Sequence, residues 1–272
     1  MILDYMEYNK QVGNKGLNCR EGENSNLFYS KRGWCNFCKS EVPKIRSNSI
    51  IDTDRLDDVV FFESEYIWQC DNCGWWEHSF ESYMESDGTS YQIYKDWEVE
   101  VNSALLRSFE VGSKEVPIEI LRRYICDNKD KVYNIHHKKM EELVGSIFKE
   151  HYNCDVHLVG KSHDGGKDLV LIESNDTKIV QVKRRITSDK VESVKEIRDL
   201  LGATLLSESR SCIFVTTADH FSSDAIKTRD RAIEKSIVDS YELYDFHSFM
   251  DLMELHKQPG KEEVWDNLIK LK

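Results

Sequence analysis

Four cysteines stand in two closely spaced pairs, Cys35 with Cys38 and Cys70 with Cys73. Two thiolates separated by two residues can bind one metal ion from a tight turn, and two such turns complete the tetrahedral site of a structural zinc ion. The spacing therefore predicts that these four residues bind Zn²⁺ in a zinc-ribbon-like module. A redox-active pair is the alternative, but the presence of two pairs favours a metal.

A second set of residues could perform hydrolysis. Asp168 opens one apolar stretch, and Gln181 and Lys183 lie two residues apart in the next, so their side chains share a face if that stretch is a strand. Glu141 lies beside an apolar helical stripe. Oxygen ligands suit Mg²⁺ or Mn²⁺, which can polarise a phosphodiester and activate water. An ammonium such as that of Lys183 can stabilise the developing charge. The same pattern also fits a hairpin whose charges simply face solvent.

The elements that must position these residues follow from the apolar periodicity. An amphipathic helix is predicted over 139–148, because its apolar residues recur with helical spacing: Met140, Leu143, Val144, Ile147 and Phe148. Strands are expected at 155–159, 168–173, 178–184, 211–216 and 237–241. Helices are expected at 190–206, 222–235 and 246–256. This order predicts an α/β fold, a mixed sheet with helices on both faces.

The N-terminal half carries weaker signals. Short strands are expected at 66–68, 90–93 and 97–101, and a short helix is expected at 117–126. Trp34, Trp75 and Trp76 are candidates for the small core that a zinc ribbon needs. The ribbon could contact nucleic acid or protein, or only stabilise its domain.

Residues 139–225 resemble the catalytic domain of Mrr-type restriction endonucleases, in the PD-(D/E)xK nuclease superfamily. The resembling pieces come in order: KMEELVGSIF (139–148), GKSHDGGKDLVLI (160–172), QVKRR (181–185), IRDLLGA (197–203) and CIFVTTADHFSSDA (212–225). One departure is Met140, where the family commonly has an aromatic residue. Another is Gln181, which is neutral where the broader superfamily has an acid, although it fits the Mrr branch.

The resemblance implies a restriction-endonuclease-like fold and a Mg²⁺- or Mn²⁺-dependent endonuclease that cleaves DNA in restriction or antiviral defence. It implies that Asp168 and Gln181 bind the metal, that Lys183 is the catalytic lysine, and that Glu141 assists at the metal. Three further residues are candidates for DNA contact: Arg185, His163 and Thr216. Thr216 could instead cap the following helix.

These observations divide the chain into three expected segments. Residues 1–115 form a zinc-ribbon-like β-rich domain, 116–135 a helical connector, and 136–272 the nuclease domain. Double-strand cleavage usually requires two active sites, so a dimer or higher homo-oligomer on DNA is expected. The N-terminal domain is a candidate for binding a protein partner.

Composition limits the function classes. The net charge of -12 does not favour nucleic-acid binding, but most of the acidic excess lies before residue 131, so the overall charge says little about a local DNA groove. No apolar run has the length of a membrane helix and no secretory signal is visible, which predicts a cytoplasmic protein. Two alternatives to the active nuclease remain. One is a catalytically idle adaptor for nucleic acid or protein, and the other is a nuclease activated by a partner or ligand.

Overall fold

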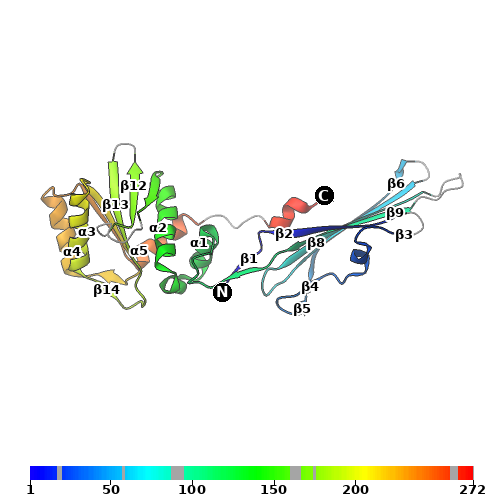
Figure 1. Ribbon diagram of the computed structural model, residues 1–272, viewed down its shortest axis with the longest axis horizontal. Helices are drawn as coiled ribbons and strands as arrows, with labels where there is room; N and C mark the ends of the chain where they lie inside the picture. Colours follow the sequence, from blue (N-terminus) through cyan, green and yellow to red (C-terminus); the bar gives the residue numbers. More distant parts are fainter. Residues whose placement is uncertain are drawn as a thin grey trace. The chain divides into compact units, whose positions relative to one another are not determined.

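The chain folds into two compact units, which a computed structural model describes over residues 1–16, 20–56, 59–86, 95–159, 167–173, 176–257 and 263–271. The helix-rich unit contains residues 1–2 and 109–259, and the β-rich unit contains residues 3–108 and 260–272. Figure 1 labels many of their helices and strands. Within the described part of the chain, no helix is long and apolar enough to cross a membrane.

A five-stranded mixed sheet forms the centre of the helix-rich unit, in the order β11-β12-β13-β15-β17. Its strands are β11 (Asp155–Leu158), β12 (Leu169–Glu173), β13 (Asp176–Lys183), β15 (Ser211–Thr216) and β17 (Ser240–Tyr244). The first three pair antiparallel, whereas β13, β15 and β17 are parallel. Every residue of β15 is buried, as expected for a parallel strand with both faces covered.

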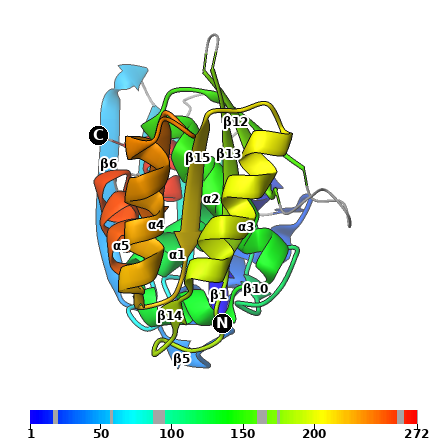
Figure 2. The same ribbon diagram turned by 90° about the vertical axis from the view of Figure 1, so that its left-hand side faces the viewer.

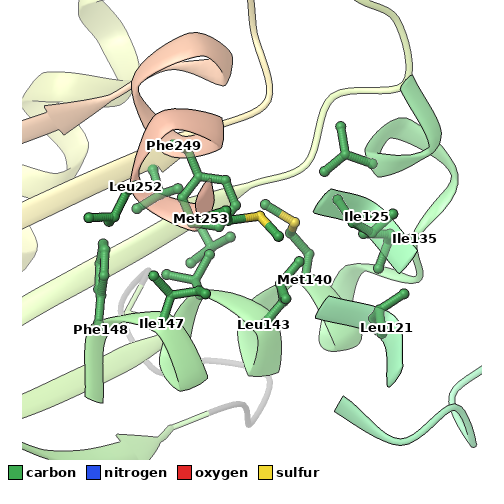
Figure 3. Packing of buried hydrophobic residues seen from close by; sticks show 14 of the residues in the cluster. Leu121, Ile125, Ile135, Met140, Leu143, Ile147, Phe148, Phe249, Leu252 and Met253 are labelled. Carbon is green, nitrogen blue, oxygen red and sulfur yellow. The ribbon is translucent and has the colours of Figure 1, made fainter. Parts of the chain in front are cut away.

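Helices cover both faces of this sheet. One layer contains α1 (Ile118–Asp127), the 3₁₀ helix η3 (Lys129–Asn134), α2 (His137–His151) and α5 (Phe246–Leu255). The other contains α3 (Val194–Leu206) and α4 (Ser223–Glu234), which Figure 2 shows in front of β13 and β15. The predicted stripe of α2 is fully buried and packs against α1 and α5 (Figure 3). The predicted mixed sheet between helices is confirmed.

The β-rich unit is built on a six-stranded antiparallel sheet in the order β3-β2-β9-β8-β7-β6. Its strands are β2 (Tyr8–Gly16), β3 (Arg20–Glu21), β6 (Lys44–Leu56), β7 (Val59–Gln69), β8 (Trp76–Ser86) and β9 (Lys95–Ala104). Shorter elements are η2 (Ser25–Tyr29), the pair β4 (Trp34–Cys35) and β5 (Ser40–Glu41), and η4 (Val264–Leu268). β1 (Ile2–Asp4) and β10 (Arg107–Phe109) form a separate two-stranded sheet.

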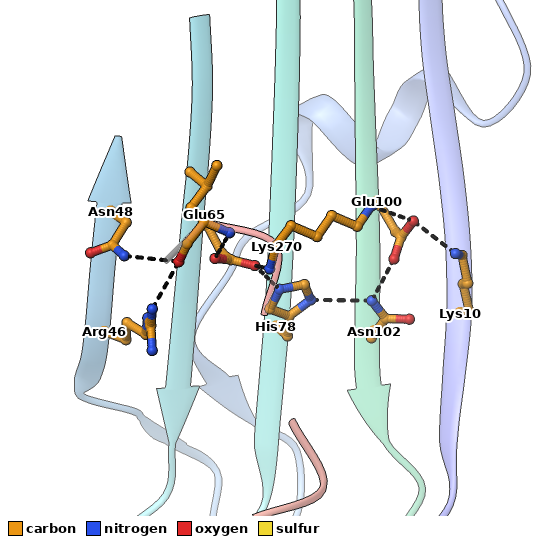
Figure 4. A network of polar contacts seen from close by, with 9 residues as sticks. Lys10, Arg46, Asn48, Glu65, His78, Glu100, Asn102 and Lys270 are labelled. Atoms are coloured by element: carbon orange, nitrogen blue, oxygen red, sulfur yellow. Dashed lines mark hydrogen bonds and ion pairs between the residues drawn. The ribbon is translucent and has the colours of Figure 1, made fainter. Parts of the chain in front are cut away.

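Residues 263–271 are held on the large sheet of the β-rich unit by a buried polar network (Figure 4). The Glu65 carboxylate accepts hydrogen bonds from the backbone N–H groups of Lys270 (2.8 Å) and Leu271 (2.9 Å). It also contacts the His78 ring at 2.7 Å, and both of these side chains are fully buried. The Lys270 ammonium pairs with Glu100 at 3.0 Å. Charged groups can remain in this interior because each has a hydrogen-bonded partner.

The structure divides the chain differently from the three expected segments. Residues 260–272, expected in the nuclease domain, lie in the β-rich unit. Their partners are residues such as Glu65, more than 200 positions away in the sequence. The N-terminal domain is expected to end at residue 115, whereas this segment of the β-rich unit ends at residue 108. The expected connector, residues 116–135, packs into the core of the helix-rich unit.

Two predicted elements and one predicted core residue need correction. The helix expected from 190 begins at Val194, because β14 (Val191–Glu192) pairs with β16 (His220–Phe221) ahead of the Ser193 cap. The strand expected at 237–241 is found at Ser240–Tyr244. Trp34 is only half-buried, and the ribbon core contains Trp68 instead, beside Trp75 and Trp76. The strand expected at 90–93 lies outside the described residues.

Candidate functional site

Asp168 lies against β13 at the entry to β12. Its backbone N–H donates to the Val180 carbonyl (3.0 Å), and its carboxylate Oδ2 accepts from the Val182 N–H (2.7 Å). These two bonds lie on either side of Gln181, so the Asp168 carboxylate is held beside the Gln-x-Lys stretch. The placement follows from the short antiparallel pairing of β12 with β13.

Gln181 and Lys183 point to the same face of the sheet, away from their neighbours Val180 and Val182. The two valines belong to the core cluster that contains α2, whereas Ile179 belongs to the cluster that contains α3. Side chains alternate along a strand, so Gln181 and Lys183 lie on the α3 side. Sequence alternation predicted the shared face, and the structure adds which helix the face meets.

Gln181 carries an unsatisfied polar atom. Its side chain is 7% exposed, and its Oε1 has no hydrogen-bond partner among the described residues. A buried carbonyl oxygen without a partner costs free energy, and such atoms in folded proteins call for an explanation. A cation that accepts oxygen ligands would satisfy it.

Glu141 comes from α2 on the opposite face of the sheet, where it is half-buried. One turn further along the same side of the helix, Gly145 abuts the sheet, since a Cβ there would lie 3.3 Å from Val156 and 3.6 Å from Leu169. The chain just before α2 is fixed to the end of β13 by a 2.6 Å bond from the Arg184 guanidinium to the Tyr133 carbonyl. Glu141 therefore lies in the turn of α2 between these two attachments.

Lys183 has an ionic partner that the sequence analysis did not identify. Its Nζ lies 3.3 Å from Glu196 Oε2, in the first turn of α3. The side chains are 36% and 20% exposed. The sequence feature that could have indicated this partner is an acidic residue in the first turn of the helix that follows the Gln-x-Lys strand.

Arg185 and Thr216, both expected to contact DNA, take part in an internal network. Arg185 binds both oxygens of Glu192, whose side chain is 1% exposed, and these hydrogen bonds raise the pKa of the guanidinium. Thr216 is fully buried, and its hydroxyl donates to Glu192 at 2.8 Å. The structure thus gives the Thr216 hydroxyl a contact inside the protein, and its expected contact with DNA stays a prediction. His163 lies outside the described residues.

The four predicted zinc ligands are brought together. The Sγ atoms of Cys35, Cys38, Cys70 and Cys73 all lie within 4.8 Å of one another, and Cys35 and Cys70 are buried. In the first turn, the Cys38 N–H points to Cys35 Sγ (3.3 Å). Gly74 follows the second pair with a φ of 80°, which suits glycine in a tight turn. The Cys₄ cluster has the ligand set of a structural zinc site and supports the predicted zinc-ribbon-like module.

Comparison with known proteins bears on the helix-rich unit. Residues 132–253 match a family model, Mrr_cat, described as a restriction endonuclease. This segment runs from η3 to α5 and includes Glu141, Asp168, Gln181 and Lys183. The match and the fold together support a restriction-endonuclease-type nuclease domain in this part of the chain. A search of curated proteins gave no match.

Proposed function

We propose that the protein is a metal-dependent endonuclease that hydrolyses DNA phosphodiester bonds in restriction or antiviral defence. The observation that carries this proposal is the buried Oε1 of Gln181, which has no hydrogen-bond partner among the described residues and lies on the same face of the sheet as Lys183. The family match to a restriction endonuclease supports the reaction class and DNA as the substrate.

The residues present fit a hard divalent cation. Asp168 supplies a carboxylate that β13 holds in place, and Gln181 supplies an amide oxygen without a partner among the described residues. Glu141, from α2 on the other face of the sheet, is the further carboxylate that the resemblance to Mrr-type endonucleases assigns to the metal. Mg²⁺ and Mn²⁺ prefer such oxygen ligands. A bound ion would polarise the phosphodiester and lower the pKa of a coordinated water molecule.

Lys183 has the role of charge stabilisation. Its ammonium is 36% exposed and reaches the same face as Gln181, so it can meet a phosphate oxygen that gains negative charge during hydrolysis. Arg185, two residues further on, is fixed by Glu192 and would position this end of β13. Cleavage of both DNA strands requires two such sites, which favours a dimer on DNA.

The β-rich unit has a separate role in this proposal. Its Cys₄ cluster would bind Zn²⁺, and the bound ion would hold the turns after Cys35 and Cys70 in place. Structural zinc contributes folding free energy directly. The unit would then act as a stable module for docking or sensing.

A plasmid-nicking assay tests the function. The full-length protein is incubated with supercoiled DNA in Mg²⁺, Mn²⁺ or EDTA, in parallel with Asp168→Ala and Lys183→Ala. Metal-dependent nicking that both substitutions abolish is expected. Nicking that survives both would contradict the assigned site. No nicking under any condition, together with a band shift on the same DNA, would instead support a binding adaptor.

A further inference from the structure

The candidate active site is short of negative charge on its sheet. Of the three residues supplied by β13 and the entry to β12, only Asp168 is acidic, because Gln181 is neutral and Lys183 is a cation. Only one carboxylate from the sheet would offset the charge of a divalent cation bound here. The neighbouring ammonium of Lys183 would repel the cation. A second carboxylate on the same face would restore the balance.

Glu196 is placed to supply that carboxylate. It projects from the first turn of α3, the helix that packs on the face where Gln181 and Lys183 lie. Its Oε2 is 3.3 Å from Lys183 Nζ, and its Oε1 is 3.6 Å from Arg185 Nη2. Both oxygens thus face cations at the end of β13, on the face of the sheet that also carries the Gln181 side chain.

The carboxylate of Glu196 can accept further partners besides Lys183 and Arg185. Each carboxylate offers about four lone-pair positions. At 20% exposure the side chain is neither sealed in the core nor fully solvated. By contrast, the nearby Glu192 is 1% exposed and already accepts hydrogen bonds from Arg185 and Thr216. Of these two acids, Glu196 is the one that an incoming ligand can reach.

We propose that Glu196 is a further acidic residue of the active site, on the face of the sheet that carries Gln181 and Lys183: it orients Lys183 and also ligates the divalent cation, in the position that neutral Gln181 cannot fill with charge. This inference rests on the proposed function, because it assumes that Asp168 and Gln181 bind that cation. It assigns α3 a part in the site, alongside the residues from the sheet and α2.

Metal binding without DNA provides the test. Mn²⁺ is titrated into the zinc-loaded full-length protein, and binding is followed by calorimetry and by the electron paramagnetic resonance signal of free Mn²⁺. The variants are Glu196→Gln, Asp168→Asn and the double variant Gln181→Glu/Glu196→Gln. Asp199→Asn is the matched control, since it removes one negative charge from an exposed position of the same helix. Glu196→Gln keeps a side-chain oxygen that can accept a hydrogen bond from Lys183, which preserves the local fold.

Glu196→Gln is expected to weaken Mn²⁺ binding by about tenfold or more, as loss of a supporting ligand typically does. Asp199→Asn is expected to bind like the parent protein. The double variant is expected to regain most of the affinity, because it moves the carboxylate from α3 to β13. Parent-like affinity in Glu196→Gln, or an equal loss in Asp199→Asn, would overturn the proposal.

The same titration separates this inference from the function on which it rests. If the parent protein binds no Mn²⁺ beyond the Asp168→Asn variant, the metal site itself is wrong and both proposals fall. If Asp168→Asn abolishes binding while Glu196→Gln does not change it, the metal-dependent site stands and only the role of Glu196 is refuted.

Discussion

The carboxylate of Asp168 accepts a 2.7 Å hydrogen bond from the backbone N–H of Val182, the residue between Gln181 and Lys183. One oxygen of the acid is thereby fixed to β13, and the residues on either side of Val182 face the opposite layer from it. The geometry of the candidate site therefore depends on the pairing of two strands rather than on a flexible side chain.

Replacement of Asp168 by asparagine should remove activity without loss of the fold. The amide oxygen can still accept from Val182, but the negative charge that attracts the cation is gone. We expect cleavage of supercoiled DNA to fall about a hundredfold or more, with a melting temperature close to that of the parent. Asp199→Asn serves as the control. Activity within a few-fold of the parent would contradict the assignment of Asp168.

Gln181→Glu should lower thermal stability when Mg²⁺ is absent and should strengthen the binding of Mg²⁺. A buried carboxylate without a partner is unfavourable, so the melting temperature of the zinc-loaded protein without added Mg²⁺ should fall. Mg²⁺ should restore it, because an ion that binds only the folded state stabilises that state. The Mg²⁺ concentration at half-maximal cleavage should also fall several-fold. An unchanged half-maximal concentration would show that Gln181 does not face the metal.

Local sequence patterns predicted the elements that carry the site. The stripe from Met140 to Phe148 is fully buried in α2, and the apolar run at 211–216 is the central strand β15. Each of these two patterns lies within a single element. Its periodicity indicates which face of that helix or strand is buried.

The features that sequence reasoning missed depend on distant partners. Val191 fits the apolar period of the following helix, yet β14 forms there and Glu192 is buried against Arg185 and Thr216. The contact of Glu196 with Lys183 likewise joins a helix to a strand. No local pattern reports such pairs, because their members are brought together only by the packing of α3 on the sheet.

Two helical glycines should respond differently to substitution. A Cβ added at Gly202 in α3 would meet no neighbouring atom within 4 Å among the described residues, so Gly202→Ala should stabilise the helix-rich unit by about 0.5–1 kcal/mol. At Gly145 a Cβ would lie 3.3 Å from Val156, so the larger Gly145→Val should push α2 away and destabilise by about 1–3 kcal/mol.

Cleavage should distinguish these variants as well. Displacement of α2 would move Glu141, so Gly145→Val should lose activity even below its melting transition, whereas Gly202→Ala should retain it. Thermal unfolding and plasmid nicking measure the two effects. Equal melting temperatures for both variants would show that α2 tolerates a side chain at this contact.

The stability of the β-rich unit should fall in acid because of Glu100. Burial alone would raise the pKa of Glu100, but hydrogen bonds from Lys10, Asn102 and Lys270 outweigh it and lower the pKa from 4.5 to about 2. The folded state thus favours the ionised form. Its stabilisation is complete above the unfolded pKa of 4.5 and is lost as the pH falls toward 2.

Urea unfolding at several pH values tests this dependence. The parent should exceed Glu100→Gln in free energy of unfolding at about pH 6, and the difference should shrink between pH 4.5 and 2. Glu98→Gln is the control, because Glu98 is exposed two residues away on the same strand. A difference between parent and Glu100→Gln that stays constant with pH would contradict the ionic role.

The Cys₄ cluster should determine both the metal content and the stability of the β-rich unit. We expect elemental analysis to find one zinc ion per chain, and Cys70→Ser to lose it, because serine is a poor zinc ligand. Since zinc binding adds directly to folding free energy, this variant should unfold at a clearly lower temperature. Cys126→Ser is the control, as Cys126 is buried in the helix-rich unit outside the cluster. A protein without zinc whose Cys35, Cys38, Cys70 and Cys73 form disulfides would instead support the redox alternative.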